Sequence, residues 1–147
     1  MKIHKLTHKS IKPYGWIIDK ACVKDNGRGN RFGILLKEQS KGWRIGFLIL
    51  RERSIKKLEM HPDSLETFEP IKGACIIALA AGKAPDRPKV FLLDKPVVLK
   101  KGVWHDVAAC RRACEIKIFE NIEVGVKYHH LKREIAARKA KAYVREI

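Results

Sequence analysis

Short runs of β-branched and aliphatic residues alternate with turn signals along most of the chain. Stretches such as "FGILL", "WRIGFLIL", "ACIIALAA" and "CEIKIF" have the length and composition of β-strands. Clusters of glycine, proline, asparagine and aspartate separate these runs, as at "DNG", "HPD" and "DKP". Many short strands with frequent turns predict a mainly β fold, built as an antiparallel sandwich or barrel.

The pattern changes at the C-terminal end. From Tyr128 the sequence "YHHLKREIAARKAKAYVREI" is rich in alanine, lysine, arginine and glutamate, with apolar positions broadly along one side of a helix. We therefore expect a β domain over residues 1–126 and a basic amphipathic helix over residues 127–147. The helix would pack on the β domain or on a partner subunit, with contact to a lipid surface or nucleic acid as the alternative.

Length, composition and charge narrow this picture. A chain of 147 residues is one domain of ordinary size, which can bury a core without needing a disulfide or a metal. It has no apolar run of membrane-spanning length and no N-terminal signal pattern, so we expect a cytoplasmic protein with four reduced cysteines and no membrane partner. The net charge of +16 favours anionic partners in general, including small substrates and nucleic acid, without choosing among them.

Two motifs concentrate the residues that could bind a metal. In "LEMHP", Glu59 and His61 stand two positions apart, so on a strand both side chains leave the same face. Glu66 follows a Pro-Asp turn, where a neighbouring strand would start, and "GVWH" supplies His105 from a later strand. Together the four side chains form a mixed nitrogen and oxygen set suited to Zn, Ni, Mn or Fe. Taken singly, the first histidine could cap a turn, and the glutamates could be solvated charges at a sheet edge.

The same residues resemble the two motifs of the cupin superfamily, a double-stranded β jelly roll with a metal in its mouth. Within it, "LEMHPDSLETFEP" followed by "GVWHD" resembles the ureidoglycolate lyase (ureidoglycolate hydrolase) family, where Glu-x-His-Pro, Gln-x-Phe-x-Pro and Gly-x-Trp-His recur in that order. The resemblance covers about residues 11–125. It implies a homodimer that cleaves ureidoglycolate to glyoxylate and urea with a divalent metal, in the degradation of allantoin during purine catabolism.

The chain departs from the family pattern at three places. Glu66 stands where the family has glutamine, which adds an anionic oxygen to the site. Leu99, Lys100 and Lys101 stand where the family usually has Tyr-His-Arg, and Asp106 stands where a second histidine is common. The fold survives such changes more easily than the choice of substrate does.

If the reaction is kept, each residue of the two motifs has a role. His61, Glu66 and His105 would hold the metal, which acidifies the hydroxyl of the substrate. Glu59 would accept the hydroxyl proton. The expected catalytic residues are therefore Glu59, Glu66 and His105.

The carboxylate of ureidoglycolate, or of a related hydroxy acid, needs a cationic partner. Arg51, at the end of "RIGFLILR", is the first choice because a guanidinium binds a carboxylate bidentately, and Lys100 is the second. Trp104, next to the second histidine, either belongs to the core or adds a contact to the substrate.

Two other function classes stay open. One is a cupin that binds an anionic metabolite or sugar without turnover, which the loss of the Tyr-His-Arg unit favours. The other is a basic nucleic-acid-associated domain, supported only by the net charge. Release of urea and glyoxylate from ureidoglycolate would separate the enzyme from the binding protein.

Overall fold

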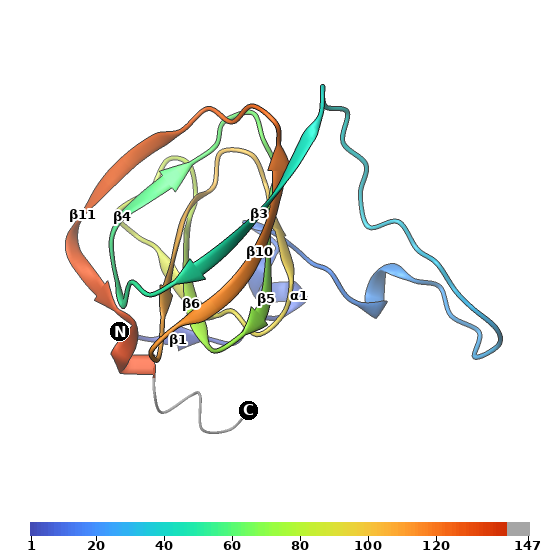
Figure 1. Ribbon diagram of the computed structural model, residues 1–147, viewed down its shortest axis with the longest axis horizontal. Helices are drawn as coiled ribbons and strands as arrows, with labels where there is room; N and C mark the ends of the chain where they lie inside the picture. Colours follow the sequence, from blue (N-terminus) through green and yellow to red (C-terminus); the bar gives the residue numbers. More distant parts are fainter. Residues whose placement is uncertain (141–147) are drawn as a thin grey trace.

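The computed structural model describes residues 1–140, which form two β-sheets (Figure 1). The helices are α1 (His8–Ile11) and the 3-10 helices η1 (Lys20–Cys22) and η2 (Ala137–Ala140). The strands are β1 (Ile3–His4), β2 (Gly15–Ile17), β3 (Trp43–Leu50), β4 (Ser54–Met60), β5 (Glu66–Lys72), β6 (Cys75–Ala80), β7 (Lys89–Leu92), β8 (Val97–Leu99), β9 (Trp104–Ala109), β10 (Cys114–Asn121) and β11 (Lys127–Ala136). In this described part, no helix has the length and apolar character needed to cross a membrane.

The strands follow a jelly-roll path. One sheet has the order β1-β7-β6-β9-β4-β11, and the other has the order β2-β8-β5-β10-β3. From β3 to β10 the chain alternates between the two sheets, except at the β6–β7 hairpin. This arrangement pairs β4 with β9, and β5 with both β8 and β10, as a jelly roll requires. The predicted fold class is therefore confirmed for the β part of the chain.

Two apolar clusters hold the sheets in place. The larger lies between the sheets and includes Phe68, Ile77, Phe91 and Ile116. The second lies on the other face of the six-stranded sheet. Successive residues of β6 alternate between the two clusters, so this strand is buried on both faces. Each fully buried aliphatic side chain stabilises the fold by roughly 1.5–3 kcal/mol.

The predicted C-terminal helix is wrong over most of the residues that the structure describes there. Lys127–Ala136 forms β11, which pairs antiparallel with β4 and has a bulge between His130 and Ile135. Helix propensity is a weak preference, and β11 instead satisfies the backbone groups of the β4 edge. Leu131 and Ile135 pack against the second cluster, so β11 is a strand of the β domain. The rest of the predicted helix, residues 141–147, lies outside the described residues.

Residues 23–42, here called the arm, connect η1 to β3. In Figure 1 the arm leaves the two sheets, turns and comes back to the start of β3. The two passes approach closely at Gly33, where an added Cβ would lie 2.1 Å from the carbonyl oxygen of Cys22. Glycine is therefore required at this point. The returning pass carries Glu38, which forms an ion pair with Lys101.

Candidate metal centre

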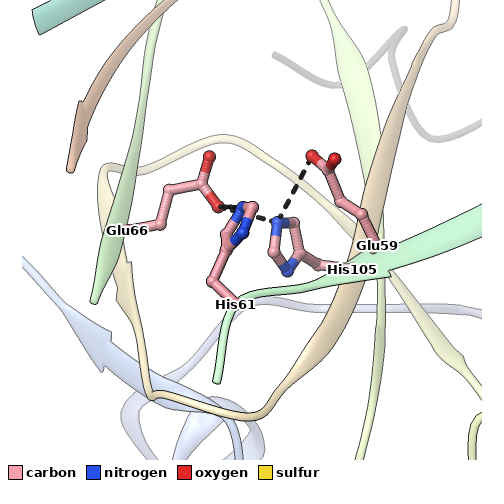
Figure 2. A group of neighbouring side chains, drawn as sticks. All are labelled: Glu59, His61, Glu66 and His105. Carbon is pink, nitrogen blue, oxygen red and sulfur yellow. Dashed lines mark ion pairs between the residues drawn. The ribbon is translucent and has the colours of Figure 1, made fainter. Parts of the chain in front are cut away.

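Four polar side chains from neighbouring strands converge on one point (Figure 2). Glu59 lies on β4, His61 directly follows that strand, Glu66 begins β5, and His105 lies on β9. Strand pairing places Glu59 opposite His105. One ligand atom from each of the four residues lies within 4.8 Å of the other three. The structure thus brings together the four residues that the sequence motifs singled out.

Glu66 is at the centre of this group. Its Oε2 atom lies 2.7 Å from His105 Nε2 and 3.1 Å from His61 Nε2. Glu59 is more distant, with its Oε1 atom 3.7 Å from His105 Nε2. The other three residues are buried, whereas the Glu59 side chain is 34% exposed. Glu59 is therefore the member that a small molecule can reach most directly.

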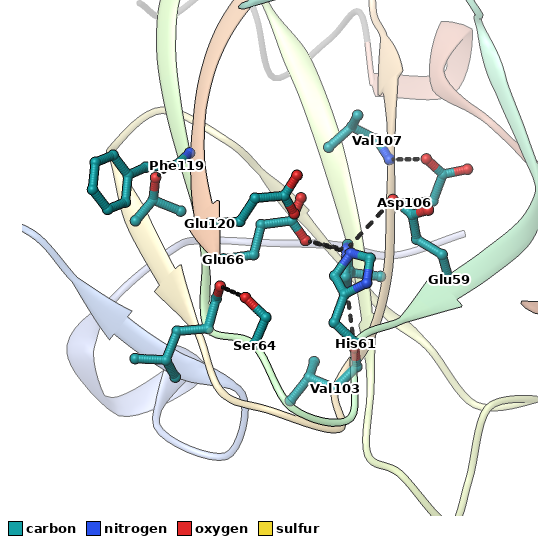
Figure 3. Close-up of polar contacts among 12 residues, drawn as sticks. Glu59, His61, Ser64, Glu66, Val103, Asp106, Val107, Phe119 and Glu120 are labelled. Atoms are coloured by element: carbon teal, nitrogen blue, oxygen red, sulfur yellow. Dashed lines mark hydrogen bonds and ion pairs between the residues drawn. The ribbon is translucent and has the colours of Figure 1, made fainter. Parts of the chain in front are cut away.

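Backbone carbonyl groups fix both imidazole rings. His61 Nδ1 lies 3.0 Å from the carbonyl oxygen of Gly125. His105 Nδ1 lies 3.0 Å from the carbonyl oxygen of Val103, which is labelled in Figure 3. Because a carbonyl oxygen only accepts hydrogen bonds, each Nδ1 donates its proton there, and each neutral ring keeps an Nε2 lone pair directed at Glu66. Backbone partners orient metal-binding histidines in the same way.

The contact at the centre requires a cation. Glu66 Oε2 and His105 Nε2 are buried and 2.7 Å apart, and within residues 1–140 their polar partners are confined to the four residues of this group. A carboxylate oxygen and an imidazole lone pair repel each other unless a proton or a metal ion lies between them. His61, Glu66 and His105, with Glu59 beside them, therefore fit a divalent cation that takes nitrogen and oxygen ligands, such as Zn, Ni, Mn or Fe.

Without a metal, protons supply the positive charge. Burial acts against the charged form of His61, but hydrogen bonds to Glu66 and Gly125 outweigh it and raise its pKa from 6.5 to about 9. The pKa of the buried His105 also rises, because Glu66 again outweighs burial. Burial alone would raise the pKa of Glu66, yet the two imidazoles lower it from 4.5 to about 2. The metal-free centre thus favours negative charge on Glu66 and positive charge on the two imidazoles.

Two known proteins are similar to most of the chain. No model of a protein family matches the sequence. Ureidoglycolate lyase 1 of Rhizobium meliloti is 28% identical over 122 residues, which cover 71% of this chain and 72% of that protein. Ureidoglycolate lyase of Agrobacterium fabrum is also 28% identical over 122 residues, covering 71% of this chain and 74% of that protein. The resemblance to ureidoglycolate lyases is confirmed.

Solved structures overlap with part of the chain. The TDP-quinovose 3,4-ketoisomerase of Campylobacter jejuni has a TM-score of 0.46 at 14% identity and covers 54% of this chain and 62% of its own. A cupin 2 domain-containing protein of Halorhodospira halophila has a TM-score of 0.45 at 11% identity and covers 63% of this chain and 60% of its own.

Arg51, the expected partner of the substrate carboxylate, does not lie at the metal centre. It directly follows β3, in the turn that leads into β4. His61 follows the other end of β4, and a seven-residue strand spans about 20 Å. The position of Arg51 therefore does not support its contact with a substrate at the centre, because β4 separates the turn after β3 from His61.

Lys100 and Trp104 lie near the ligands in sequence, but their side chains point elsewhere. Lys100 Nζ donates to the carbonyl oxygen of Lys12 at 2.7 Å and lies 5.3 Å from the centroid of the Trp16 ring. The side chains of Trp104 and His105 leave opposite faces of β9, and Trp104 packs in the second cluster. Its Nε1 donates to a backbone carbonyl at 3.0 Å. Their placement thus does not support contact of either side chain with a substrate at the centre.

A cavity of about 360 Å³ opens beside the metal centre, between β3 and β10 on one side and β4 on the other. Arg44 lines it, and its Nε and Nη2 donate to Glu120 Oε1 at 3.0 and 2.8 Å. The motifs gave no sign of Arg44, and strand periodicity could have shown only which face of β3 it shares. Arg44 shares one face of β3 with Gly46 and Leu48, and Leu48 packs against the core between the sheets.

Proposed function

We propose that this protein is a metal-dependent carbon–nitrogen lyase that cleaves ureidoglycolate, or a closely related ureido hydroxy acid, to an oxo acid such as glyoxylate and urea. The convergence of Glu59, His61, Glu66 and His105 on one point carries the proposal. The likeness to two ureidoglycolate lyases supports the substrate class. The adjacent cavity of about 360 Å³ is of a size that suits a small molecule.

His61, Glu66 and His105 are the ligands that we assign to the metal. When bound, a divalent cation supplies Lewis acidity that lowers the pKa of a substrate hydroxyl and stabilises the developing carbonyl oxygen. The protein contributes the fixed orientation of both rings through their Nδ1 hydrogen bonds.

Glu59 is the group that we assign to proton transfer. It takes the hydroxyl proton of the substrate, and the hydroxyl oxygen becomes the carbonyl oxygen of glyoxylate as the carbon–nitrogen bond breaks. The electron pair of that bond passes to the nitrogen, which takes the proton back from Glu59 and leaves as urea. The exposure of the Glu59 side chain, 34%, supports this role because Glu59 is the most accessible of the four residues to a substrate in the cavity.

Arg44 replaces Arg51 as the residue that we assign to the substrate carboxylate. Glu120 accepts from only two of the five N–H groups of a guanidinium, so donors remain for a second carboxylate in the cavity. Glu120 also holds the guanidinium in place before the substrate arrives. Arg44→Lys would keep the charge but lose the planar fork, so we expect a higher KM.

The test is release of glyoxylate from ureidoglycolate by protein loaded in turn with Zn, Ni, Mn or Fe. We expect turnover with at least one metal and its loss after treatment with a chelator. Glu59→Gln should lower kcat by about 100-fold or more while the metal is retained. His61→Ala and His105→Ala should lose the metal, as measured by elemental analysis, and His130→Ala, an exposed histidine of β11, should behave like the wild type.

Two results would overturn the proposal in different ways. Metal-loaded protein that binds ureidoglycolate but forms no product would favour the non-catalytic cupin that binds an anionic metabolite. Equal metal content in the wild type, His61→Ala and His105→Ala would show that these residues are not the ligands.

A further inference from the structure

A row of three charged side chains crosses the inner face of the five-stranded sheet beside the metal centre. Glu120 of β10 lies directly opposite Glu66 of β5 on one side and directly opposite Arg44 of β3 on the other. Opposite residues of an antiparallel pair lie on the same face, with Cβ atoms about 4.5–5.5 Å apart. Figure 3 shows the side chains of Glu66 and Glu120 side by side. Glu120 is thus the middle member of a row that begins at a proposed metal ligand.

Glu120 faces the same space as the metal centre. Its side chain is 13% exposed, and it lines the cavity of about 360 Å³ together with Glu59, His61 and Glu66. Like charges directly opposite each other on a sheet repel, so each carboxylate of the pair needs its own positive partner. Glu66 has the two imidazoles of the centre, and Glu120 has Arg44. The two glutamates therefore serve different parts of the cavity.

Arg44 occupies only one oxygen of Glu120. Its Nε and Nη2 both donate to Oε1, at 3.0 and 2.8 Å. A guanidinium more often divides two such hydrogen bonds between the two oxygens of a carboxylate. Because both hydrogen bonds end on Oε1, the Oε2 atom keeps its lone pairs for a donor in the cavity. An ionised carboxylate only accepts hydrogen bonds, so the ligand group that suits Oε2 is an N–H or O–H and not a second carboxylate.

We propose that Glu120 determines specificity by accepting a hydrogen bond at Oε2 from the terminal NH2 of a ureido group. The assignment rests on the proposed function, in which Arg44 binds the substrate carboxylate. The two members of one ion pair then hold the two ends of the substrate, since a ureido acid carries an anion at one end and N–H donors at the other. A site that offers a buried acceptor rejects an analogue without the donor, because the acceptor is left unpaired.

Two unreactive probes test this assignment by binding alone. N-carbamoylglycine carries the carboxylate and the ureido group, and N-acetylglycine has a methyl group in place of the terminal NH2. Neither has the hydroxyl that the reaction needs, so titration calorimetry with Zn-loaded protein measures affinity without turnover. The wild type should bind N-carbamoylglycine at least about tenfold more tightly, which is the effect of one hydrogen bond to a charged group.

Variants of the row separate recognition of the two ends. In Glu120→Gln the amide oxygen remains for Arg44 and the NH2 group takes the place of Oε2, so the affinity ratio of the probes should fall to about one. Arg44→Lys should weaken both probes to the same extent and keep the ratio, because it changes the contact to the carboxylate that they share. Glu115→Gln is the matched control, since Glu115 is also on β10 but about 16 Å further along the strand. It should keep both affinities, and circular dichroism should show that every variant is folded.

The outcomes distinguish this assignment from the proposed reaction. Equal affinity of the wild type for the two probes, no measurable binding of either, or a ratio that persists in Glu120→Gln would overturn the role of Glu120. If such a protein still releases glyoxylate from ureidoglycolate, the reaction stands without this residue. A tenfold ratio that Glu120→Gln abolishes and Glu115→Gln keeps would support the role of Glu120, even in a protein that forms no product.

Discussion

At the residue scale, the negative charge of Glu66 controls the centre. Its Oε2 atom lies between two imidazole Nε2 atoms, at 2.7 and 3.1 Å, in a buried position. An amide in this place would have no charge to balance a divalent cation or two imidazolium rings. The resembling family has glutamine here, so this residue also distinguishes the chain from the pattern it otherwise follows.

Glu66→Gln should therefore weaken metal binding, while the side chain keeps nearly the same shape. We expect the metal affinity to fall by at least about tenfold, because loss of even a residue that only hydrogen-bonds to a metal ligand lowers metal affinity by about 10–100-fold. Competition titration against a chromophoric chelator measures the change. Glu69→Gln, on the same strand but ion-paired with Lys117, is the control and should keep the wild-type affinity. Unchanged affinity in Glu66→Gln would remove this residue from the ligand set.

The metal-free centre also predicts how stability depends on pH. The pKa of His61 is about 9 in the folded protein against an ordinary value of 6.5, so folding binds this proton more tightly. Its stabilising contribution is complete below pH 6.5 and is lost as the pH rises toward 9. The difference in unfolding free energy between the wild type and His61→Asn, measured by urea titration in EDTA, should shrink over that range. A difference that grows with pH would contradict the ion pair with Glu66.

The residues that the sequence placed well are those fixed by short-range spacing. Glu59 and His61 share a face because they are two apart on a strand, and Glu66 follows one turn later. Arg51 could not be placed from the sequence, because its position depends on which end of β3 faces the ligands, and the local sequence does not state this. Arg44 was missed for the same reason, since only the long-range pairing of β3 with β10 brings it beside the centre.

At the element scale, the strands were predictable because apolar and turn residues alternate at short intervals. The structure of the C-terminal segment was not predictable in this way. Its alanine, lysine and arginine content favours a helix by only a few tenths of a kcal/mol per residue. Pairing along β4 and burial of Leu131 and Ile135 outweigh that preference. A composition-based prediction cannot include either contribution, because both depend on a strand about 70 residues earlier in the chain.

Ile55 tests how much the β4–β11 contact contributes. It is fully buried on β4, opposite Ile135 of β11. Ile55→Ala should lower the free energy of unfolding by about 2–5 kcal/mol, because it leaves a cavity under β11. Ile122→Ala, at a residue that is 56% exposed, is the control and should change stability by less than about 0.5 kcal/mol. Urea denaturation measures both, and equal losses would mean that β11 does not cover Ile55 in solution.

At the scale of the whole molecule, the proposed metal ligands come from both sheets, so the centre exists only when the jelly roll is folded. His61 and His105 belong to the β4 and β9 side, and Glu66 belongs to β5 of the other sheet. The core between the sheets, not the metal, supplies the main stabilisation, because its apolar side chains are almost fully buried. At the proposed site, a bound cation would add to this stability by linking the two sheets.

Metal binding should consequently raise the melting temperature by mass action. At a free metal concentration 100 times Kd, the folded state gains about 2.7 kcal/mol, which for a domain of this size corresponds to roughly 5–10 °C. Differential scanning calorimetry with and without EDTA measures the shift. His105→Ala should show no shift, because it removes a ligand from β9, and His130→Ala should shift like the wild type because it is exposed on β11. An equal shift in all three proteins would mean that the cation binds elsewhere on the folded protein, because a shift that survives the loss of His105 does not depend on this ligand.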